Sequence, residues 1–224
     1  MPLNLSKPII YLITSGATTP ASTPASEDFQ SVLALARAAV RARIPLVQLR
    51  EKNLATRALY ELAALCVEIT RGTETRLLIN DRADVACAAG ADGVHLAVQS
   101  MESQVVRRAF GPSFLIGVSA HSFAEAQAAR DGGADFAVFG PIFDTPQKRP
   151  YGAPLGIDAL RETADRLAPF PLLALGGITG ENAPHALRAG ASGIAAIRLF
   201  SKLEKLDAVA AAILDGQNCD LKQR

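Results

Sequence analysis

The chain has 224 residues, of which 49% are hydrophobic and 20% charged, so it can bury a sizeable core as one large α/β domain or two small ones. Its 23 lysines and arginines nearly balance its 22 aspartates and glutamates, which excludes a strong overall field for nucleic acid or an anionic membrane. It has no run of 18 apolar residues and no basic-then-apolar N-terminus, so we expect neither a transmembrane helix nor a signal peptide. Cys66, Cys87 and Cys219 are widely spaced, as expected for reduced thiols in a cytoplasmic protein.

The first half of the chain alternates apolar runs with segments of helical periodicity. Residues 9–14 form an apolar run that predicts a buried strand. Residues 16–26, rich in Thr, Ser, Pro and Ala, are too polar to pack and predict a flexible loop, with a lid over a binding site as the alternative. The pattern then predicts strands over 44–52, 76–81 and 93–96 and helices over 29–42, 56–70 and 83–89.

The second half continues this alternation. Ser122, with Glu125 three residues later, has the pattern of a capping box, and Asn182 stands where a helix cap is expected. Residues 144–154 predict a polar loop and residues 215–224 a polar tail. The pattern predicts strands over 114–119, 135–140, 171–175 and 192–197, and helices over 102–110, 122–130, 157–167, 182–189 and 206–214.

Eight strands that alternate with eight helices predict parallel strands joined by helical crossovers. The strands are apolar almost throughout, so both faces of the sheet should be buried. An open doubly wound sheet is the competing fold, but it usually carries a Gly-x-Gly-x-x-Gly turn after its first strand, and residues 14–18 lack that pattern. We therefore expect residues 1–224 to form a single (β/α)8 TIM barrel.

Polar residues gather at the carboxyl ends of the expected strands, which meet at the mouth where barrel enzymes place their active sites. An extended strand would turn Gln48, Arg50 and Lys52 to one face, and two cations there need an anionic partner if they are buried. A strand end that frays into solvent is the alternative. The residues expected at the mouth are Thr14, Gln48, Arg50, Lys52, Asn80, Asp81, His95, Ser119, His121, Gly140, Gly176, Gly177 and Arg198.

Two features of this mouth predict phosphorylated small molecules as ligands. Gly176 and Gly177 follow the seventh strand, where glycines let backbone N–H groups approach phosphate oxygens closely. Such a pair also occurs in a plain tight turn. Positive charge for a monophosphate or diphosphate comes from Arg50, Lys52, Lys148 and Arg198.

Asp81 is the candidate ligand for Mg2+, which binds one or two carboxylates together with phosphate oxygens. Its alternative role is to cap the helix that follows. His95 and His121 can each be structural, and His121 can also transfer a proton, because a histidine at a barrel mouth titrates near neutrality.

Several segments taken together resemble the thiamine phosphate synthase family, within a wider superfamily that includes the thiazole tautomerases. The resemblance extends in order from Tyr11 to about Ser201. It implies the barrel fold that the alternation of elements predicts. The segments are Gln48-Leu49-Arg50-Glu51-Lys52, Asn80-Asp81-Arg82, Ala91-Asp92-Gly93-Val94-His95, Gly117-Val118-Ser119-Ala120-His121-Ser122, Gly140-Pro141-Ile142-Phe143, Lys148 and Gly176-Gly177-Ile178.

This resemblance implies that hydroxymethylpyrimidine diphosphate and thiazole phosphate, or its carboxylate, are joined to give thiamine phosphate and diphosphate through a pyrimidine carbocation. It also implies that Asp81 binds Mg2+ and that His95 lines the pyrimidine pocket. By the same resemblance, Thr145 and Gly177 fall where the family holds the thiazole phosphate. The residues that would hold the pyrimidine diphosphate are Gln48, Arg50, Lys52, Asn80, Ser119 and Lys148.

The chain departs from the family pattern at three positions that handle metal and phosphate. Ser100 stands where the family has an aspartate that is its second magnesium ligand, and a neutral hydroxyl should hold the metal more loosely. Gln147 replaces a threonine of the family's Thr-x-Thr-Lys loop, and Arg198 replaces a serine that helps hold the thiazole phosphate.

Two alternatives follow from these departures. One is a metal-independent thiazole tautomerase in which His121 is the general acid and base, although the chain retains Gln48, Asn80 and Lys148 as a synthase would. The other is a non-catalytic protein that binds thiazole phosphate. A homo-oligomer is compatible with the sequence.

Overall fold

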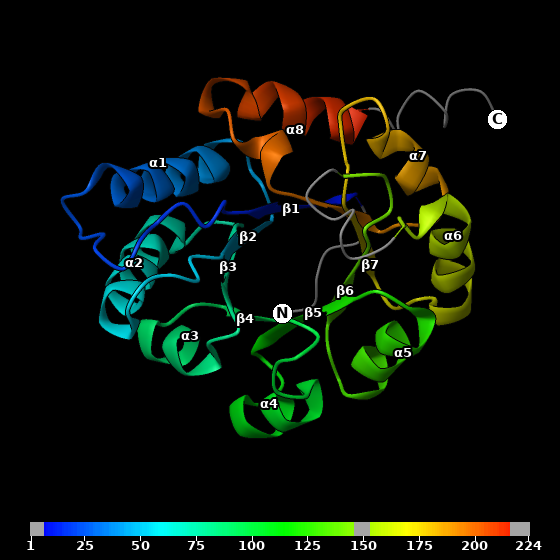
Figure 1. Ribbon diagram of the computed structural model, residues 1–224, viewed down its shortest axis with the longest axis horizontal. Helices are drawn as coiled ribbons and strands as arrows, with labels where there is room; N and C mark the ends of the chain where they lie inside the picture. The colour runs from blue at the N-terminus through cyan, green and yellow to red at the C-terminus, as the bar shows by residue number, and fades with distance from the viewer. Residues whose placement is uncertain (1–6, 146–152, 216–224) are drawn as a thin grey trace.

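The computed structural model describes residues 7–145 and 153–215, and its strands close into one parallel barrel in the order β1 to β8. Figure 1 looks along this barrel, with the helices arranged around it. The prediction of a (β/α)8 barrel is confirmed. The strands are β1 (Ile9–Ile13), β2 (Leu46–Leu49), β3 (Arg76–Asn80), β4 (Gly93–Leu96), β5 (Leu115–Ala120), β6 (Phe136–Phe139), β7 (Leu172–Leu175) and β8 (Gly193–Ala196).

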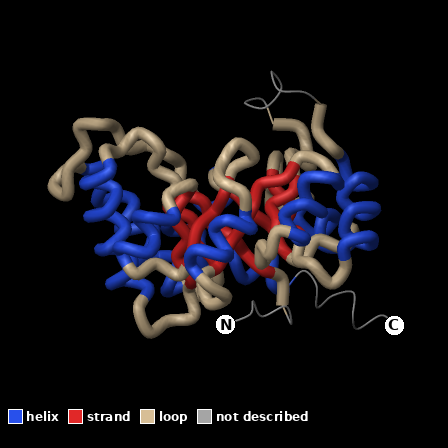
Figure 2. The backbone as a smooth tube through the Cα atoms, turned by 90° about the horizontal axis from the view of Figure 1, so that it is seen from below, coloured by secondary structure: helices blue, strands red, loops and turns tan. Residues whose placement is uncertain are grey.

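A helix follows each strand and packs outside the barrel, so the strands lie at the centre in the side view of Figure 2. No helix in the described ranges combines the length and apolar character that crossing a membrane requires. The α-helices are α1 (Glu27–Arg41), α2 (Thr56–Thr70), α3 (Ala83–Ala89), α4 (Ser103–Phe110), α5 (Phe123–Asp131), α6 (Gly156–Leu167), α7 (Ala183–Arg188) and α8 (Leu206–Asp215). Two 3-10 helices, η2 (Arg198–Phe200) and η3 (Leu203–Lys205), connect β8 to α8.

The apolar side chains form one core inside the barrel and others between the strands and the helices. On β1, Tyr11 belongs to the interior core, whereas Ile10 and Leu12 pack outward with Phe29 of α1. This is why the strand reads as a continuous apolar run: both of its faces are buried. Cys66 lies in the outer core and is 1% exposed, which confirms its packing role.

Two carboxylates form hydrogen bonds at the amino ends of the strands. Asp92 accepts hydrogen bonds from the Leu77 backbone N–H and the Arg76 guanidinium, both at 2.9 Å. Asp135 accepts in the same way from the Ile116 backbone N–H and the Arg107 guanidinium, both at 2.7 Å. These contacts provide hydrogen-bond partners for backbone N–H groups that would otherwise lack one. The two carboxylates therefore have a structural role, far from the mouth.

The two predicted helix caps have different outcomes. Ser122 Oγ accepts from the Glu125 backbone N–H at 3.2 Å, as predicted, but the Glu125 carboxylate accepts from the His121 N–H at 2.6 Å instead of completing the box at Ser122. Asn182 is the N-cap residue of α7, as predicted, but its side chain forms no capping hydrogen bond. Its amide accepts from Thr179 N–H and donates to Gly177 C=O, both at 2.8 Å, so it holds the β7–α7 loop in place.

Candidate active site

The carboxyl ends of β2 to β5 bring four of the predicted residues to one side of the barrel mouth. Gln48 and Asn80 each lie two positions after a residue of the interior core on the same strand. Because side chains alternate along a strand, both therefore face the interior. Asn80 is paired in register with His95 on β4. His95 Nε2 lies 2.9 Å from Ser119 Oγ on β5. The structure thus gathers Gln48, Asn80, His95 and Ser119 as expected, while the role of each stays a prediction.

Three buried polar atoms in this region have no hydrogen-bond partner among the described residues: Tyr11 Oη, Gln48 Nε2 and His95 Nδ1. The Tyr11 and His95 rings lie with centroids 5.6 Å apart, and burial raises the pKa of Tyr11 well above its usual value. Unpaired buried polar atoms are costly. They therefore mark a place where a ligand with hydrogen-bonding groups would be stabilised.

Tyr11 was missing from the predicted site, because it lies within an apolar strand and reads as core. A signal was present in the sequence: Tyr11 is the one residue in 9–13 with a polar side-chain atom, and a buried tyrosine hydroxyl usually finds a partner.

His95 should make the free energy of unfolding depend on pH. Burial is the main reason that its pKa falls from 6.5 to about 4, with Asp81 raising it and Arg50 lowering it by smaller amounts. The unfolded chain binds a proton at His95 below about pH 6.5, whereas the folded chain binds it only near pH 4. The contribution of His95 to the free energy of unfolding is therefore complete above pH 6.5 and is lost between pH 6.5 and 4. The loss expected in metal-free buffer is about 3 kcal/mol at most.

Urea unfolding of the wild type and of His95→Gln, at intervals from pH 7.5 to 4.5, measures this contribution. The difference in unfolding free energy between the two proteins should shrink as the pH falls through this window. A difference that stays constant over the same range would show that the imidazole is protonated in the folded protein as readily as in the unfolded chain.

Asp81 and Ser100, separated by 19 residues in the sequence, lie side by side at the mouth. The Asp81 carboxylate accepts a hydrogen bond from Ser100 Oγ, from the Ala97 backbone N–H at 2.9 Å and from Asn80 Nδ2 at 2.9 Å. Asp81 has a left-handed backbone, with φ of 59°, and is exposed. It does not cap α3, whose capping residue is Arg82 and which receives no side-chain cap.

This corner offers hard oxygen donors, which are the kind of ligand that Mg2+ prefers. Across residues 7–145 and 153–215, however, no three His, Cys, Asp or Glu side chains are grouped closely enough to hold a metal ion. The donor set would suit a magnesium ion held only in part by Asp81 and Ser100, with water and ligand phosphate completing the coordination. Magnesium binding at Asp81 remains a prediction.

The two predicted cations of the second strand follow β2 rather than lying on it. β2 ends at Leu49, so of the three residues predicted to share one face of a strand only Gln48 lies on it. Arg50 is half-buried and Lys52 is exposed, whereas Glu51 between them is buried and 2% exposed. Glu51 was not among the predicted site residues.

The expectation that residues 16–26 are too polar to pack is wrong for Thr18 and Ser22, which are 1% and 6% exposed. Ser22 Oγ accepts from Thr19 N–H at 2.8 Å, and Thr18 is hydrogen-bonded to Glu51. Hydrogen bonds therefore replace the apolar side chains that this segment lacks.

The β6–β8 side of the mouth contains the residues expected to hold a second phosphate. Gly177 has a φ of 63°, and a Cβ added there would lie 2.6 Å from the Asp144 carbonyl oxygen, so the glycine also allows Asp144 to pack closely. Thr145 is buried, and its Oγ1 lies 3.4 Å from Arg198 Nη2. Thr145, Gly177 and Arg198 are thus brought together, whereas Lys148 lies outside the described residues.

His121 lies at the rim, where its side chain is held by the neighbouring strand. Its Nδ1 is hydrogen-bonded to the Gly140 carbonyl oxygen at the end of β6. A carbonyl can only accept, so Nδ1 carries the proton, and in the neutral imidazole Nε2 is left as the acceptor.

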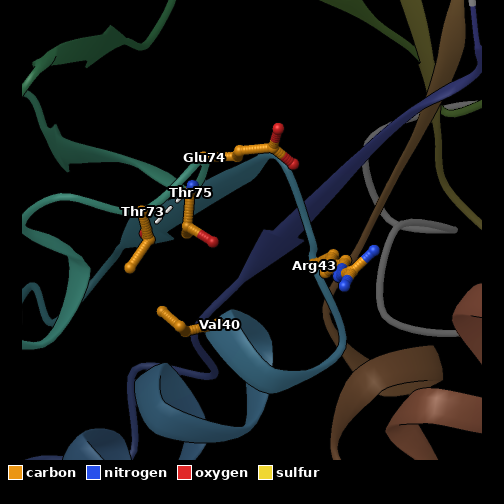
Figure 3. A pocket seen from close by; sticks show the side chains of 5 residues that line it. All are labelled: Val40, Arg43, Thr73, Glu74 and Thr75. Atoms are coloured by element: carbon orange, nitrogen blue, oxygen red, sulfur yellow. Dashed lines mark hydrogen bonds between the residues drawn. The ribbon is translucent and has the colours of Figure 1, made fainter.

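A pocket of about 380 Å3 lies at the opposite end of the strands, between the α1–β2 and α2–β3 connections (Figure 3). It is lined by Val40, Arg43, Thr73, Glu74 and Thr75. None of the predicted site residues contributes to it, and it offers no group of converging carboxylates or unpaired buried polar atoms. The chemistry is therefore sought at the mouth.

Similarity to known proteins extends over nearly the whole barrel. Residues 12–200 match the family described as Thiamine monophosphate synthase. The thiamine-phosphate synthase of Roseiflexus castenholzii is 35% identical over 215 residues, which cover 96% of this chain and 90% of that protein. The thiamine-phosphate synthase of Chloroflexus aurantiacus is 43% identical over 178 residues, which cover 79% and 81%. The solved thiamine phosphate pyrophosphorylase from Pyrococcus furiosus superposes with a TM-score of 0.74 at 29% identity and covers 94% of this chain and 98% of that chain.

Proposed function

Because this chain belongs to the thiamine monophosphate synthase family, we propose that it joins hydroxymethylpyrimidine diphosphate to thiazole phosphate, or to its carboxylate, and releases diphosphate. Its relatives named thiamine-phosphate synthase make it a transferase of thiamine biosynthesis. The observation that carries the choice of substrates is the set of unpaired buried polar atoms on Tyr11, Gln48 and His95, below a rim that carries Arg50 and Asp81.

The interior of the barrel suits an aminopyrimidine ring. Such a ring has an amino donor and ring-nitrogen acceptors, which complement a buried amide, a phenol and a neutral imidazole. Because burial holds the pKa of His95 at about 4, this side chain is neutral at pH 7 and can accept or donate without adding a charge. The ring would supply the partners that Gln48 Nε2, Tyr11 Oη and His95 Nδ1 lack.

The diphosphate of the same substrate would then lie toward the rim, near Arg50, Lys52, Asn80 and Ser119. In the proposed reaction, the bond between the pyrimidine methylene carbon and the diphosphate oxygen breaks, and its electron pair leaves with the diphosphate. The thiazole nitrogen then donates its lone pair to the resulting carbocation. Where the thiazole carries a carboxylate, CO2 leaves, and the carbon that keeps the electron pair takes up a proton from water. Cationic and hydrogen-bonding groups that stabilise the leaving diphosphate would lower the barrier. Mg2+, when bound, would neutralise part of the charge on that leaving group.

The thiazole phosphate would bind across the mouth, at Thr145, Gly177 and Arg198. The Thr145 hydroxyl, lying 3.4 Å from the Arg198 guanidinium, places a neutral donor beside a permanent cation. A guanidinium can bind two phosphate oxygens at once. Arg198 would thus replace the hydroxyl contact of the family's serine with a charged one.

Restoring the missing carboxylate should tighten magnesium binding. Ser100 already hydrogen-bonds to Asp81, so in Ser100→Asp two carboxylates would face one metal site. We expect the Mg2+ concentration for half-maximal activity to fall by about tenfold or more, because Mg2+ prefers one or two carboxylates. Titration of activity with MgCl2 measures this shift, and Ser100→Asn, which adds similar bulk without charge, is the control. An unchanged or higher half-maximal concentration in Ser100→Asp would place the metal away from this corner.

The proposed function is tested by incubating the purified protein with both substrates and following thiamine phosphate by chromatography. Product should form only when both substrates are present. No product at high enzyme concentration, over a range of Mg2+ concentrations, would contradict the synthase proposal.

His121 supports a second candidate, the thiazole tautomerase. Its Nδ1 bond to Gly140 leaves Nε2 as a proton acceptor at the rim. This activity should survive EDTA and be lost in His121→Ala, whereas the synthase should require Mg2+ and retain turnover in that variant. The two assays on one preparation distinguish the candidates.

A further inference from the structure

Glu51 is a buried carboxylate whose hydrogen-bond partners all come from the end of β1 and the loop after it. Oε1 accepts from Thr14 Oγ1 at 2.6 Å and from Gly16 N–H at 3.2 Å. Oε2 accepts from Thr18 Oγ1 at 2.7 Å and from Thr18 N–H at 3.1 Å. Two hydroxyls and two backbone amides therefore converge on one carboxyl group from positions 33 to 37 residues earlier in the chain.

The same contacts reach the backbone of Arg50. Thr14 Oγ1 donates to Glu51 and accepts from the Arg50 backbone N–H at 2.8 Å. Gly16 has a left-handed φ of 76°, and a Cβ added there would lie 3.2 Å from the Arg50 carbonyl oxygen and 3.6 Å from its Nη1. The β1–α1 loop thus passes directly over Arg50.

We propose that Glu51 is a positioning residue: it fastens the β1–α1 loop to the end of β2 and thereby fixes Arg50 for contact with the diphosphate. The proposal rests on the proposed function for the identity of that ligand. An ionised carboxylate can only accept, so it satisfies four converging donors, which is what allows its charge to be buried. A glutamine in its place would turn an NH2 group toward donors and lose at least one pair of contacts.

A second variant separates positioning from the mere presence of a buried charge. Thr14→Val keeps the shape of Thr14, which is 2% exposed, but removes the hydroxyl that links Glu51 to the Arg50 N–H. If Glu51 acts through Thr14, the two variants should have the same effect on diphosphate binding although only one alters the charge.

Asp92→Asn is the matched control. Asp92 also accepts a backbone N–H and a guanidinium, but it lies at the amino end of β4, away from the mouth. It should lower the free energy of unfolding without changing the affinity for either substrate, so it reports what loss of a structural carboxylate does by itself.

The experiment compares KM for each substrate, the Kd for inorganic diphosphate by calorimetry, and amide hydrogen exchange in the wild type, Glu51→Gln, Thr14→Val and Asp92→Asn. We expect Glu51→Gln and Thr14→Val to raise KM for the pyrimidine diphosphate and Kd for diphosphate by about tenfold, because Arg50 would lose the hydrogen-bonded contacts that hold it in place. KM for thiazole phosphate should stay within twofold. Exchange should become faster at Gly16 and Thr18 in Glu51→Gln.

Glu51→Gln with wild-type diphosphate affinity and wild-type KM would overturn the proposal, as would a wild type that does not bind diphosphate. Failure of the proposed function has a different signature: the wild type would make no thiamine phosphate, while diphosphate affinity and amide exchange would still report whether Glu51 positions Arg50.

Discussion

Asp81→Asn is expected to lower kcat/KM for thiamine phosphate formation by roughly 10²- to 10³-fold, the effect of removing one well-placed electrostatic group. Asparagine tolerates the left-handed backbone at this position, where φ is 59°. Its amide oxygen can still accept from the Ala97 N–H, which lies 2.9 Å from the carboxylate. The substitution therefore removes charge while retaining local structure, and steady-state kinetics at saturating Mg2+ measures the loss.

Asp84→Asn is the control for this experiment. Asp84 lies on α3, three positions after Asp81, and its carboxylate forms an exposed ion pair with Arg82 at 2.6 Å. Exposed pairs contribute little to stability, so this variant should keep wild-type kinetics. Equal activity in the wild type and Asp81→Asn would remove Asp81 from the metal site.

Gly117→Ala should destabilise the barrel interior next to the site. A Cβ at Gly117 would lie 2.4 Å from the Phe136 ring and 2.7 Å from His95 Nδ1. Phe136 is fully buried and meets Tyr11 edge-on, with ring centroids 5.4 Å apart, so it has little room to move. Overpacking of this kind costs about 1–3 kcal/mol, or a fall in Tm of about 3–10 °C for a chain of this size. Displacement of His95 should also raise KM for the pyrimidine substrate.

Gly180→Ala provides the comparison, because a Cβ there meets nothing within 4 Å. Its Tm should change by less than about 2 °C, in keeping with an exposed substitution. Calorimetric melting of both variants beside the wild type measures the effect. A Gly117→Ala protein that melts with the wild type would mean that the barrel interior can relax around the added methyl group.

The barrel was predictable because each strand is followed by a helix of clear periodicity, and because strands buried on both faces read as apolar runs. The positions of Asn80, His95 and Ser119 followed from the same logic, since strand ends in a parallel barrel meet at one mouth. Local interactions within a few residues, such as Ser122 with the Glu125 N–H, were also within reach of the sequence pattern.

What the sequence concealed depends on contacts between distant residues. Glu51 reads as one more charge in a polar segment, and its partners lie 33 to 37 residues earlier. Tyr11 is predicted as a core residue, because the apolar run around it does not reveal that its hydroxyl lacks a hydrogen-bond partner. In each case tertiary contacts, and not local preference, determine the role.

The synthase proposal is tested most directly by measuring thiamine phosphate and diphosphate together in one reaction, first with Mg2+ and then with EDTA. The synthase proposal predicts equal amounts of the two products with Mg2+, and neither with EDTA, because magnesium would be needed to neutralise the leaving diphosphate. Diphosphate released without thiamine phosphate would show hydrolysis of the pyrimidine substrate. That result, or the absence of both products with Mg2+ present, would contradict the account.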